Sequence, residues 1–439
     1  MTPRRITFAR VLYLVGGALA VGNGIIELGP DARPAVQATG WPLIVTGLLA
    51  FVLVWLLRKQ RRWLPVAAVA VSLAMIAARI FQYTVLGTPF LLATGLLPLF
   101  AAWSVFRAEW PEQPVVRKGF ALSAVLVTSA ALIVVGGAGT VAAVLPCDLP
   151  PPAATSGLTD SGGPATGSAK PSGTISATDG VKLAYYAFRP AHPLASLVFY
   201  HGSGANSTAG YLGIGQTLQS QGIAVYLFDL RGHGASGGPR GDTPSSPQLQ
   251  RDTESAVSFV HRAQPGVPEF VGGHSAGAGV VLNSAELIRS EVAGYAFLAP
   301  DFGLHSGTEV QDDAANFATI CQRPLIAATV TNGLLGAHTE AVAFAYTAAQ
   351  IRSGLIPRYT AAMAIAQNAD DSASILAGLH APIGVWVGEK DEVFNAAKVI
   401  DYAKQHGGPK VTATAVPGAS HLGVLDDSVL MGQWILANR

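Results

Sequence analysis

Residues 269–279 read EFVGGHSAGAG and contain the pattern G-x-S-x-G, with Ser275 at its centre. The segment follows an apolar run and opens a helical pattern, which predicts a sharp turn from a strand into a helix. On such a turn the serine hydroxyl stands clear of the sheet, and the backbone N–H of Ala276 points toward the carbonyl under attack. Gly273 and Gly277 suit the turn because strand and helix pass close to it. We therefore expect Ser275 to be a nucleophile.

Two downstream loops offer the base and the acid that a nucleophilic serine requires. A strand-like alternation of Thr with Ala and Val ends shortly before His421, which is the candidate general base. Residues 382–387 are typical of a short buried strand, and its exit loop carries Glu389, Asp391 and Glu392. Asp391 is favoured as the acid that orients the imidazole. Glu389 and Glu392 remain open as alternatives.

A second backbone donor is expected in the loop at residues 201–206, which follows the strand-like residues 197–200. The glycines of this loop allow its backbone to turn a free N–H toward the site. By position, the N–H of Ser203 would pair with that of Ala276 to form an oxyanion hole. His201 and His274 are interpreted as groups that orient loops, and Arg231 and His233 as groups that brace a glycine-rich turn.

These motifs together resemble one known family over about residues 172–439. The matching segments are His201-Gly202-Ser203-Gly204, the run FDLRGHGASG at 228–237, Gly273-His274-Ser275-Ala276-Gly277, Gly388-Glu389-Lys390-Asp391 and Ser420-His421. They resemble the monoglyceride lipase and serine aminopeptidase-like branch of the α/β hydrolases, whose triad runs in the order Ser, acid, His. One departure is that this family often has Met where Ala276 stands and a second Gly where Ala278 stands.

The resemblance implies an α/β fold with a doubly wound, mainly parallel sheet and a helical cap. It also implies a serine hydrolase that cleaves carboxylic esters of monoacylglycerol or lysophospholipid type through an acyl-enzyme and a Ser275–His421–Asp391 triad. A peptidase or amidase with the same triad is an alternative, because the nucleophile does not distinguish an ester from an amide. A further alternative is a catalytically idle hydrolase domain on a membrane sensor or partner-binding module.

Other classes of function find little support in the sequence. The formal net charge is +1, and the hydrolase-like half has no basic cluster, which argues against a nucleic-acid partner. The sequence has no H-E-x-x-H pattern and no Cys/His cluster, so neither a metal nor another cofactor is expected. The expected partner is a small-molecule ester or lipid.

The first third of the chain is predicted to be a membrane domain, residues 1–146, because it consists of long apolar runs. The expected spans are Phe8–Glu27, Trp41–Leu57, Trp63–Ile80, Pro89–Phe106 and Phe120–Leu145. The basic residues Arg58, Lys59, Arg61, Arg62, Arg107, Arg117 and Lys118 fall in the second and fourth loops. With a cytoplasmic N-terminus these loops lie inside, and five crossings place the hydrolase domain outside the cytoplasm.

Residues 147–173 are rich in Pro, Ser, Gly and Ala and predict a flexible linker. The hydrolase domain is then expected over residues 174–439, where strand patterns alternate with helical ones. Residues 301–379 interrupt that alternation and are expected to form an Ala-rich, helical cap. Whether Cys147 and Cys321 form a disulfide is left open.

Overall fold

The computed structural model describes residues 2–27, 34–57, 64–86, 96–106, 147–149, 169–310 and 317–439. The chain divides into two compact units. The first comprises Met1–Val144 with Ile326–Leu335, and the second comprises Leu145–Leu325 with Gly336–Arg439.

The first unit contains apolar helices whose outer surfaces are also apolar. These helices are α1 (Thr2–Glu27), α2 (Pro34–Leu56), α3 (Leu64–Leu86) and α5 (Leu96–Phe106). Polar contacts lie inside, where the hydroxyl of Tyr13 donates to the carbonyl of Ala68 at 2.8 Å. Large apolar side chains point outward, among them Trp41, which is 63% exposed, and Val66, which is 65% exposed.

The expected region of about five spans is not shown by the structure. Among the described residues, one helix, over Ile6–Ile25, is long and apolar enough to cross a membrane. The apolar stretches Trp41–Leu56 and Leu64–Arg79 fall in the shorter class of 10–17 residues, below the length that a span requires. The expected span at 120–145 lies outside the described residues.

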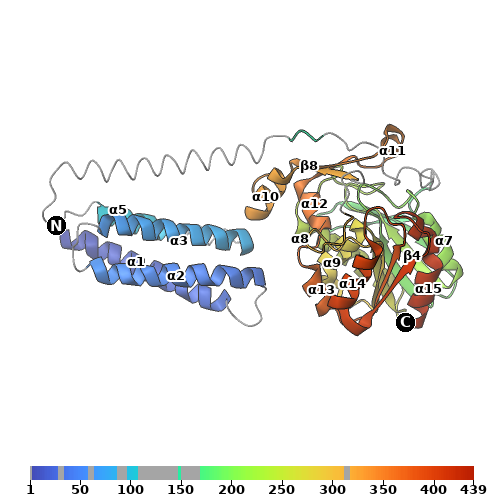
Figure 1. Ribbon diagram of the computed structural model, residues 1–439, viewed down its shortest axis with the longest axis horizontal. Helices are drawn as coiled ribbons and strands as arrows, with labels where there is room; N and C mark the ends of the chain where they lie inside the picture. Colours follow the sequence, from blue (N-terminus) through green and yellow to red (C-terminus); the bar gives the residue numbers. More distant parts are fainter. Residues whose placement is uncertain are drawn as a thin grey trace. The chain divides into compact units, whose positions relative to one another are not determined.

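The second unit is built on an eight-stranded, mostly parallel sheet (Figure 1). Its order is β1-β2-β4-β3-β5-β6-β10-β11, and only the pairs β1–β2 and β2–β4 are antiparallel. The strands are β1 (Gly173–Ser176), β2 (Lys182–Phe188), β3 (Ala195–Tyr200), β4 (Ile223–Phe228), β5 (Glu269–His274), β6 (Gly294–Leu298), β10 (Ile383–Gly388) and β11 (Val411–Val416). The predicted α/β fold with a mainly parallel sheet is confirmed.

Burial along the strands explains their sequence patterns. Every residue of β3, β4, β5 and β6 is buried, because helices cover both faces of the sheet, and these strands read as apolar runs. The edge strand β11 instead alternates between half-buried and exposed positions.

Helices pack on both sides of the sheet (Figure 1). On one side, α7 (Leu212–Ser220) and α15 (Ser428–Ala437) contact each other and enclose a core that includes Phe199, Phe270 and Trp434. The other helices are α8 (Ser246–Ala263), α9 (Ala276–Ile288), α13 (Ser372–Gly378) and α14 (Ala396–Gly407). Of these, α8 begins after Ser245, whose side chain accepts a hydrogen bond from the N–H of Gln248, a standard N-cap.

The cap region differs from the expectation of a purely helical segment. It contains a three-stranded antiparallel sheet of β7 (Ala318–Ile320), β8 (Glu340–Phe344) and β9 (Arg358–Thr360). The accompanying helices are short: α10 (Gln322–Val330), α11 (Ala348–Arg352) and α12 (Ala361–Gln367). The prediction missed this sheet because Ala favours helices, and strands of 3–5 residues give too little alternation to outweigh that preference.

A disulfide joins Cys147 to Cys321 at the end of β7, which answers the question that the sequence left open. Beside it, the guanidinium of Arg358 donates to the carbonyl of Leu149 at 3.1 Å. Residues 147–149 are thus attached to the cap sheet by a covalent bond and a hydrogen bond.

Glu269 stands at the start of β5, at the far end of that strand from Ser275, and carries a buried carboxyl group. The residue is 2% exposed, and neither carboxyl oxygen has a hydrogen-bond partner among the described residues. The Nδ1 atom of the His261 ring lies 3.6 Å from one carboxyl oxygen. Burial raises the pKa of the Glu269 carboxyl group from 4.5 to about 9.

We expect Glu269→Gln to stabilise the fold increasingly as the pH rises. Between the ordinary pKa and the raised one, the folded state holds a proton that the unfolded chain has released, so the wild-type protein loses stability with rising pH. Gln removes this penalty, which is roughly 5 kcal/mol at pH 8 and almost nothing near pH 4. Urea unfolding at both pH values measures the difference, with the exposed Glu286→Gln as a control. An equal stabilisation at both pH values would contradict the argument.

Candidate active site

Ser275 occupies a strained turn between β5 and α9. Its backbone has φ 54° and ψ −126°, a conformation that a residue with a side chain rarely adopts. A Cβ on Gly273 would lie 2.3 Å from the carbonyl carbon of Gly277, and a Cβ on Gly277 would lie 2.5 Å from the carbonyl oxygen of Tyr200. Both glycines are therefore required by close packing around the turn, as the motif predicts.

Asp391 and His421 are brought together from two loops that follow adjacent parallel strands, β10 and β11. The Nδ1 atom of the His421 ring lies 2.9 Å and 3.1 Å from the two carboxylate oxygens of Asp391. The same carboxylate accepts hydrogen bonds from the N–H groups of Val393 and Phe394, at 2.9 and 2.8 Å. These bonds hold the carboxylate in place against the ring.

The two rival carboxylates lie elsewhere. Glu392 accepts a hydrogen bond from the backbone N–H of His421 at 2.9 Å, so it contacts the main chain of that residue and not the ring nitrogens. Glu389 accepts from the N–H of Gly418 at 3.1 Å. The geometry thus favours Asp391 as the partner of the imidazole.

The His421 loop is attached to the serine turn through His274. The Nε2 atom of His274 lies 3.0 Å from the carbonyl oxygen of His421, and the two ring centroids are 4.7 Å apart. The Ser275 hydroxyl itself makes no hydrogen bond within the described part of the chain. Catalytic hydrogen bonds are often long before substrate binds, and they shorten in the complex.

The loop that carries Ser203 lies directly against the serine turn. A Cβ on Gly202 would stand 3.2 Å from the Cβ of Ser275. The backbone N–H groups of Ser203 and Ala276 have no hydrogen-bond acceptor among the described residues. Two N–H donors without an acceptor, both close to the serine turn, are what an oxyanion hole requires.

A directed chain of hydrogen bonds connects this loop to the His421 loop. A carbonyl oxygen only accepts, so His274 must donate from Nε2 to His421 and accept at Nδ1. The donor to Nδ1 is the hydroxyl of Tyr211, at 2.9 Å, and that hydroxyl accepts from the N–H of Gly202, also at 2.9 Å. Burial lowers the pKa of His274 well below its usual value, which keeps the ring neutral as this chain requires.

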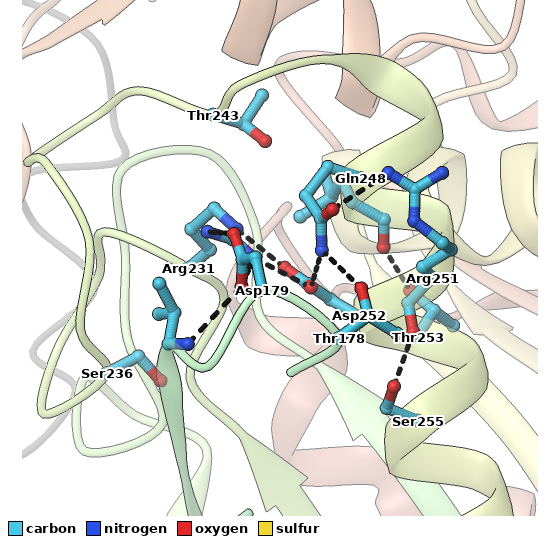
Figure 2. A network of polar contacts seen from close by, with 12 residues as sticks. Thr178, Asp179, Arg231, Ser236, Thr243, Gln248, Arg251, Asp252, Thr253 and Ser255 are labelled. Atoms are coloured by element: carbon cyan, nitrogen blue, oxygen red, sulfur yellow. Dashed lines mark hydrogen bonds and ion pairs between the residues drawn. The ribbon is translucent and has the colours of Figure 1, made fainter. Parts of the chain in front are cut away.

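Arg231 braces the turn after β4, as expected from the sequence (Figure 2). Its buried guanidinium donates to both oxygens of Asp252, at 2.7 and 2.9 Å, and to both oxygens of Asp179, at 2.8 and 3.1 Å. Gln248 adds a further bond to Asp252 at 2.9 Å. The hydrogen bonds from Arg231 lower the pKa of Asp179. The network joins the turn to the β1–β2 hairpin and to α8.

The sequence analysis missed three residues beside the site. Asp301 donates its N–H to the carbonyl of Ser275 at 3.1 Å, and burial raises the pKa of its carboxyl group. Its position just after β6, on the same sheet edge as the other loops, was an available signal. Tyr211 and Tyr359 gave no such signal, because neither belongs to a recognisable motif.

Comparisons with known proteins agree with this fold. A family model described as "Serine aminopeptidase, S33" matches residues 191–428. The chain is 30% identical to a monoacylglycerol lipase of Mycolicibacterium smegmatis over 129 residues, which is 29% of this chain and 46% of that protein. It is 28% identical to the human monoglyceride lipase over 123 residues, 28% of this chain and 40% of that protein. Both alignments span less than half of the relative's length.

Solved structures with a similar fold include a monoacylglycerol lipase of Paleococcus ferrophilus. That structure has a TM-score of 0.42 and 19% sequence identity, and the match covers 58% of this chain and 99% of the other. Est1E of Butyrivibrio proteoclasticus, bound to ferulic acid, has a TM-score of 0.43 at 17% identity, and the match covers 60% of this chain and 99% of the other.

Proposed function

Because the chain belongs to the serine aminopeptidase S33 family of hydrolases, we propose that it cleaves carboxylic esters by an acyl-enzyme mechanism. The observation that carries the proposal is the buried Asp391–His421 pair, whose loop is hydrogen-bonded to the strained turn of Ser275. Relatives named as monoacylglycerol lipases favour lipid-like substrates, of monoacylglycerol or lysophospholipid type.

In this mechanism the Ser275 oxygen attacks the ester carbonyl while His421 Nε2 accepts the hydroxyl proton. Asp391 holds Nδ1 protonated and stabilises the imidazolium that forms. The N–H groups of Ser203 and Ala276 bind the oxyanion of the tetrahedral intermediate. The intermediate collapses to an acyl-serine as His421 returns the proton to the leaving alcohol. Water then attacks the acyl-serine with the same base, releasing the acid and regenerating Ser275.

The apolar first unit supports a membrane location. Its helices expose more than half of the surface of Phe8, Trp41, Val66 and Trp103, and large apolar side chains exposed on several helices suit lipid better than water. We therefore propose that residues 1–146 form a membrane domain of several spans, joined by the linker at 147–173 to the hydrolase domain. A lipid substrate would then diffuse within the same bilayer that holds the enzyme.

The disulfide supports an extracytoplasmic hydrolase domain. Cys147 and Cys321 are bonded, and structural disulfides persist mainly in oxidising compartments. This agrees with the orientation that the basic loops and an odd number of crossings imply.

The topology is tested by fusing reporters to the C-terminus. We expect alkaline phosphatase, which is active only after export, to give signal, and a cytosolic fluorescent reporter to give none. Fusions after residue 146 and after residue 439 should agree, because the linker does not cross the membrane. A cytosolic signal would mean an even number of spans.

The enzymatic proposal is tested on the full-length protein with a fluorophosphonate probe. The probe should label the protein, and mass spectrometry of the labelled peptide should place the adduct on Ser275. Initial rates on p-nitrophenyl esters of graded chain length and on monoacylglycerols should exceed those on aminoacyl p-nitroanilides. The reverse preference would indicate a peptidase, and the absence of both labelling and turnover would indicate an idle domain.

A further inference from the structure

The cap segment, residues 301–379, makes hydrogen bonds to the loop that carries Ser203. The hydroxyl of Tyr346 donates to the carbonyl of Ser203, and the N–H of Ile356 donates to the carbonyl of Gly204 at 2.8 Å. The N–H of Gly204 donates to the hydroxyl of Tyr359, which lies in the cap strand β9, at 2.5 Å. Three groups of the cap segment therefore bind two consecutive residues of the loop.

The approach is close enough to require glycine at position 204. Gly204 has φ +66°, a conformation that favours glycine. A Cβ there would stand 2.6 Å from the carbonyl oxygen of Ile356 and 2.6 Å from the ring of Tyr346. The loop and the cap are thus fitted to each other, and the loop conformation depends on the position of the cap.

The direction of the hydrogen bond at Tyr359 follows from its second partner, His233. The Nδ1 atom of His233 lies 2.8 Å from the carbonyl oxygen of Arg231, so Nδ1 must donate. Burial lowers the pKa of His233 well below its usual value, so Nε2 is unprotonated and accepts. The Tyr359 hydroxyl, 2.6 Å from Nε2, therefore donates to the ring, and its oxygen is left to accept from Gly204.

Two Tyr–His pairs thus hold the glycines on either side of Ser203. The Tyr211 hydroxyl donates to His274 and accepts from the N–H of Gly202. In the same way, the Tyr359 hydroxyl donates to His233 and accepts from the N–H of Gly204. Ser203 is left as the residue between them whose N–H has no acceptor among the described residues.

We propose that Tyr359 is a positioning residue through which the cap orients the Ser203 N–H toward the oxyanion that forms in the reaction. This inference rests on the proposed function, because it assigns a role in the same reaction. The contact is made to the loop that carries the oxyanion donor, so the cap acts on the rate of the chemical step.

The test is Tyr359→Phe in the full-length protein, assayed with a short p-nitrophenyl ester. The variant leaves the Gly204 N–H and His233 Nε2 without partners, so the loop loses one of its three contacts with the cap and shifts at Ser203. We expect kcat to fall about 10- to 100-fold with KM nearly unchanged, in line with the cost of a misplaced oxyanion donor. Affinity for a boronic acid, which mimics the tetrahedral intermediate, should fall by a similar factor.

Tyr295→Phe is the matched control. Tyr295 is equally buried, but its hydroxyl has no hydrogen-bond partner among the described residues and lies in β6 away from the loop. Its kcat and boronic acid affinity should equal those of the wild type. The thermal midpoint of each variant separates a loss of rate from a loss of fold.

A second variant, His233→Asn, keeps a donor for Arg231 and removes the acceptor for Tyr359. It should reduce kcat in the same direction, and the double variant should be little slower than Tyr359→Phe alone, because both changes break one chain of hydrogen bonds. A wild-type kcat in Tyr359→Phe, or fully additive losses, would overturn the inference. If the wild-type protein shows no turnover that depends on Ser275, the proposed function fails instead.

Discussion

Replacing Ser275 by Ala is expected to reduce kcat by about 10⁴- to 10⁶-fold without destabilising the protein. The change removes the oxygen that forms the acyl-enzyme in the proposed mechanism. It leaves no buried partner unsatisfied, because the Ser275 hydroxyl makes no hydrogen bond within the described part of the chain. Residual hydrolysis would come from the backbone donors of Ser203 and Ala276 alone. Steady-state kinetics and the thermal midpoint of the same preparation measure both effects.

The same kinetic measurements on a His421→Ala variant and on the double variant show whether Ser275 acts together with His421. We expect His421→Ala to cost about as much as Ser275→Ala, and the double variant to be no slower than either single one, since the groups act as a unit. Ser284→Ala serves as the control and should keep full activity, because Ser284 lies in α9 and its hydroxyl donates, within the described residues, only to the carbonyl of Val280. Additive losses would mean that Ser275 and His421 do not act as a unit, and labelling that survives in Ser275→Ala would place the nucleophile on another serine.

The sequence predicted the features whose signal is local or periodic. The turn at Ser275 follows from two glycines and an apolar strand, and the close contacts of Gly273 and Gly277 explain why both are needed. The position of Asp391 beside His421 follows from the parallel pairing of two adjacent strands, which brings their exit loops to one edge. Tyr359 was not predicted, because its partners Gly204 and His233 are 155 and 126 residues away in sequence.

The cap shows where composition alone misleads. Ala-rich segments favour helix in isolation, yet Ala341 and Ala343 lie in a strand because β7 and β9 supply hydrogen-bonding partners on both sides. In the first unit, apolar composition predicted several spans. Among the described residues, only Ile6–Ile25 combines that composition with sufficient uninterrupted length.

Replacing Asp391 by Asn is expected to reduce kcat about 10⁴-fold, the second large effect. Asp391 accepts from His421 Nδ1 and from the N–H groups of Val393 and Phe394. After the substitution the backbone N–H groups would keep the side-chain oxygen, and the new amide nitrogen would face the ring. A ring that must accept at Nδ1 carries its proton on Nε2, and such a tautomer cannot take the proton of Ser275. Steady-state kinetics on a short p-nitrophenyl ester measure the loss.

Glu392→Gln and Glu389→Gln provide matched controls for this prediction, because each removes one carboxylate charge from the same loop. The amide oxygen introduced at position 392 can still accept from the backbone N–H of His421, and the one introduced at position 389 can still accept from Gly418. We expect both variants to keep kcat within about threefold of the wild type, since an amide oxygen replaces the carboxylate oxygen in each bond. If kcat instead falls by several orders of magnitude in Glu392→Gln and not in Asp391→Asn, Glu392 is the acid that pairs with His421. The His421 loop would then have to rearrange when substrate binds.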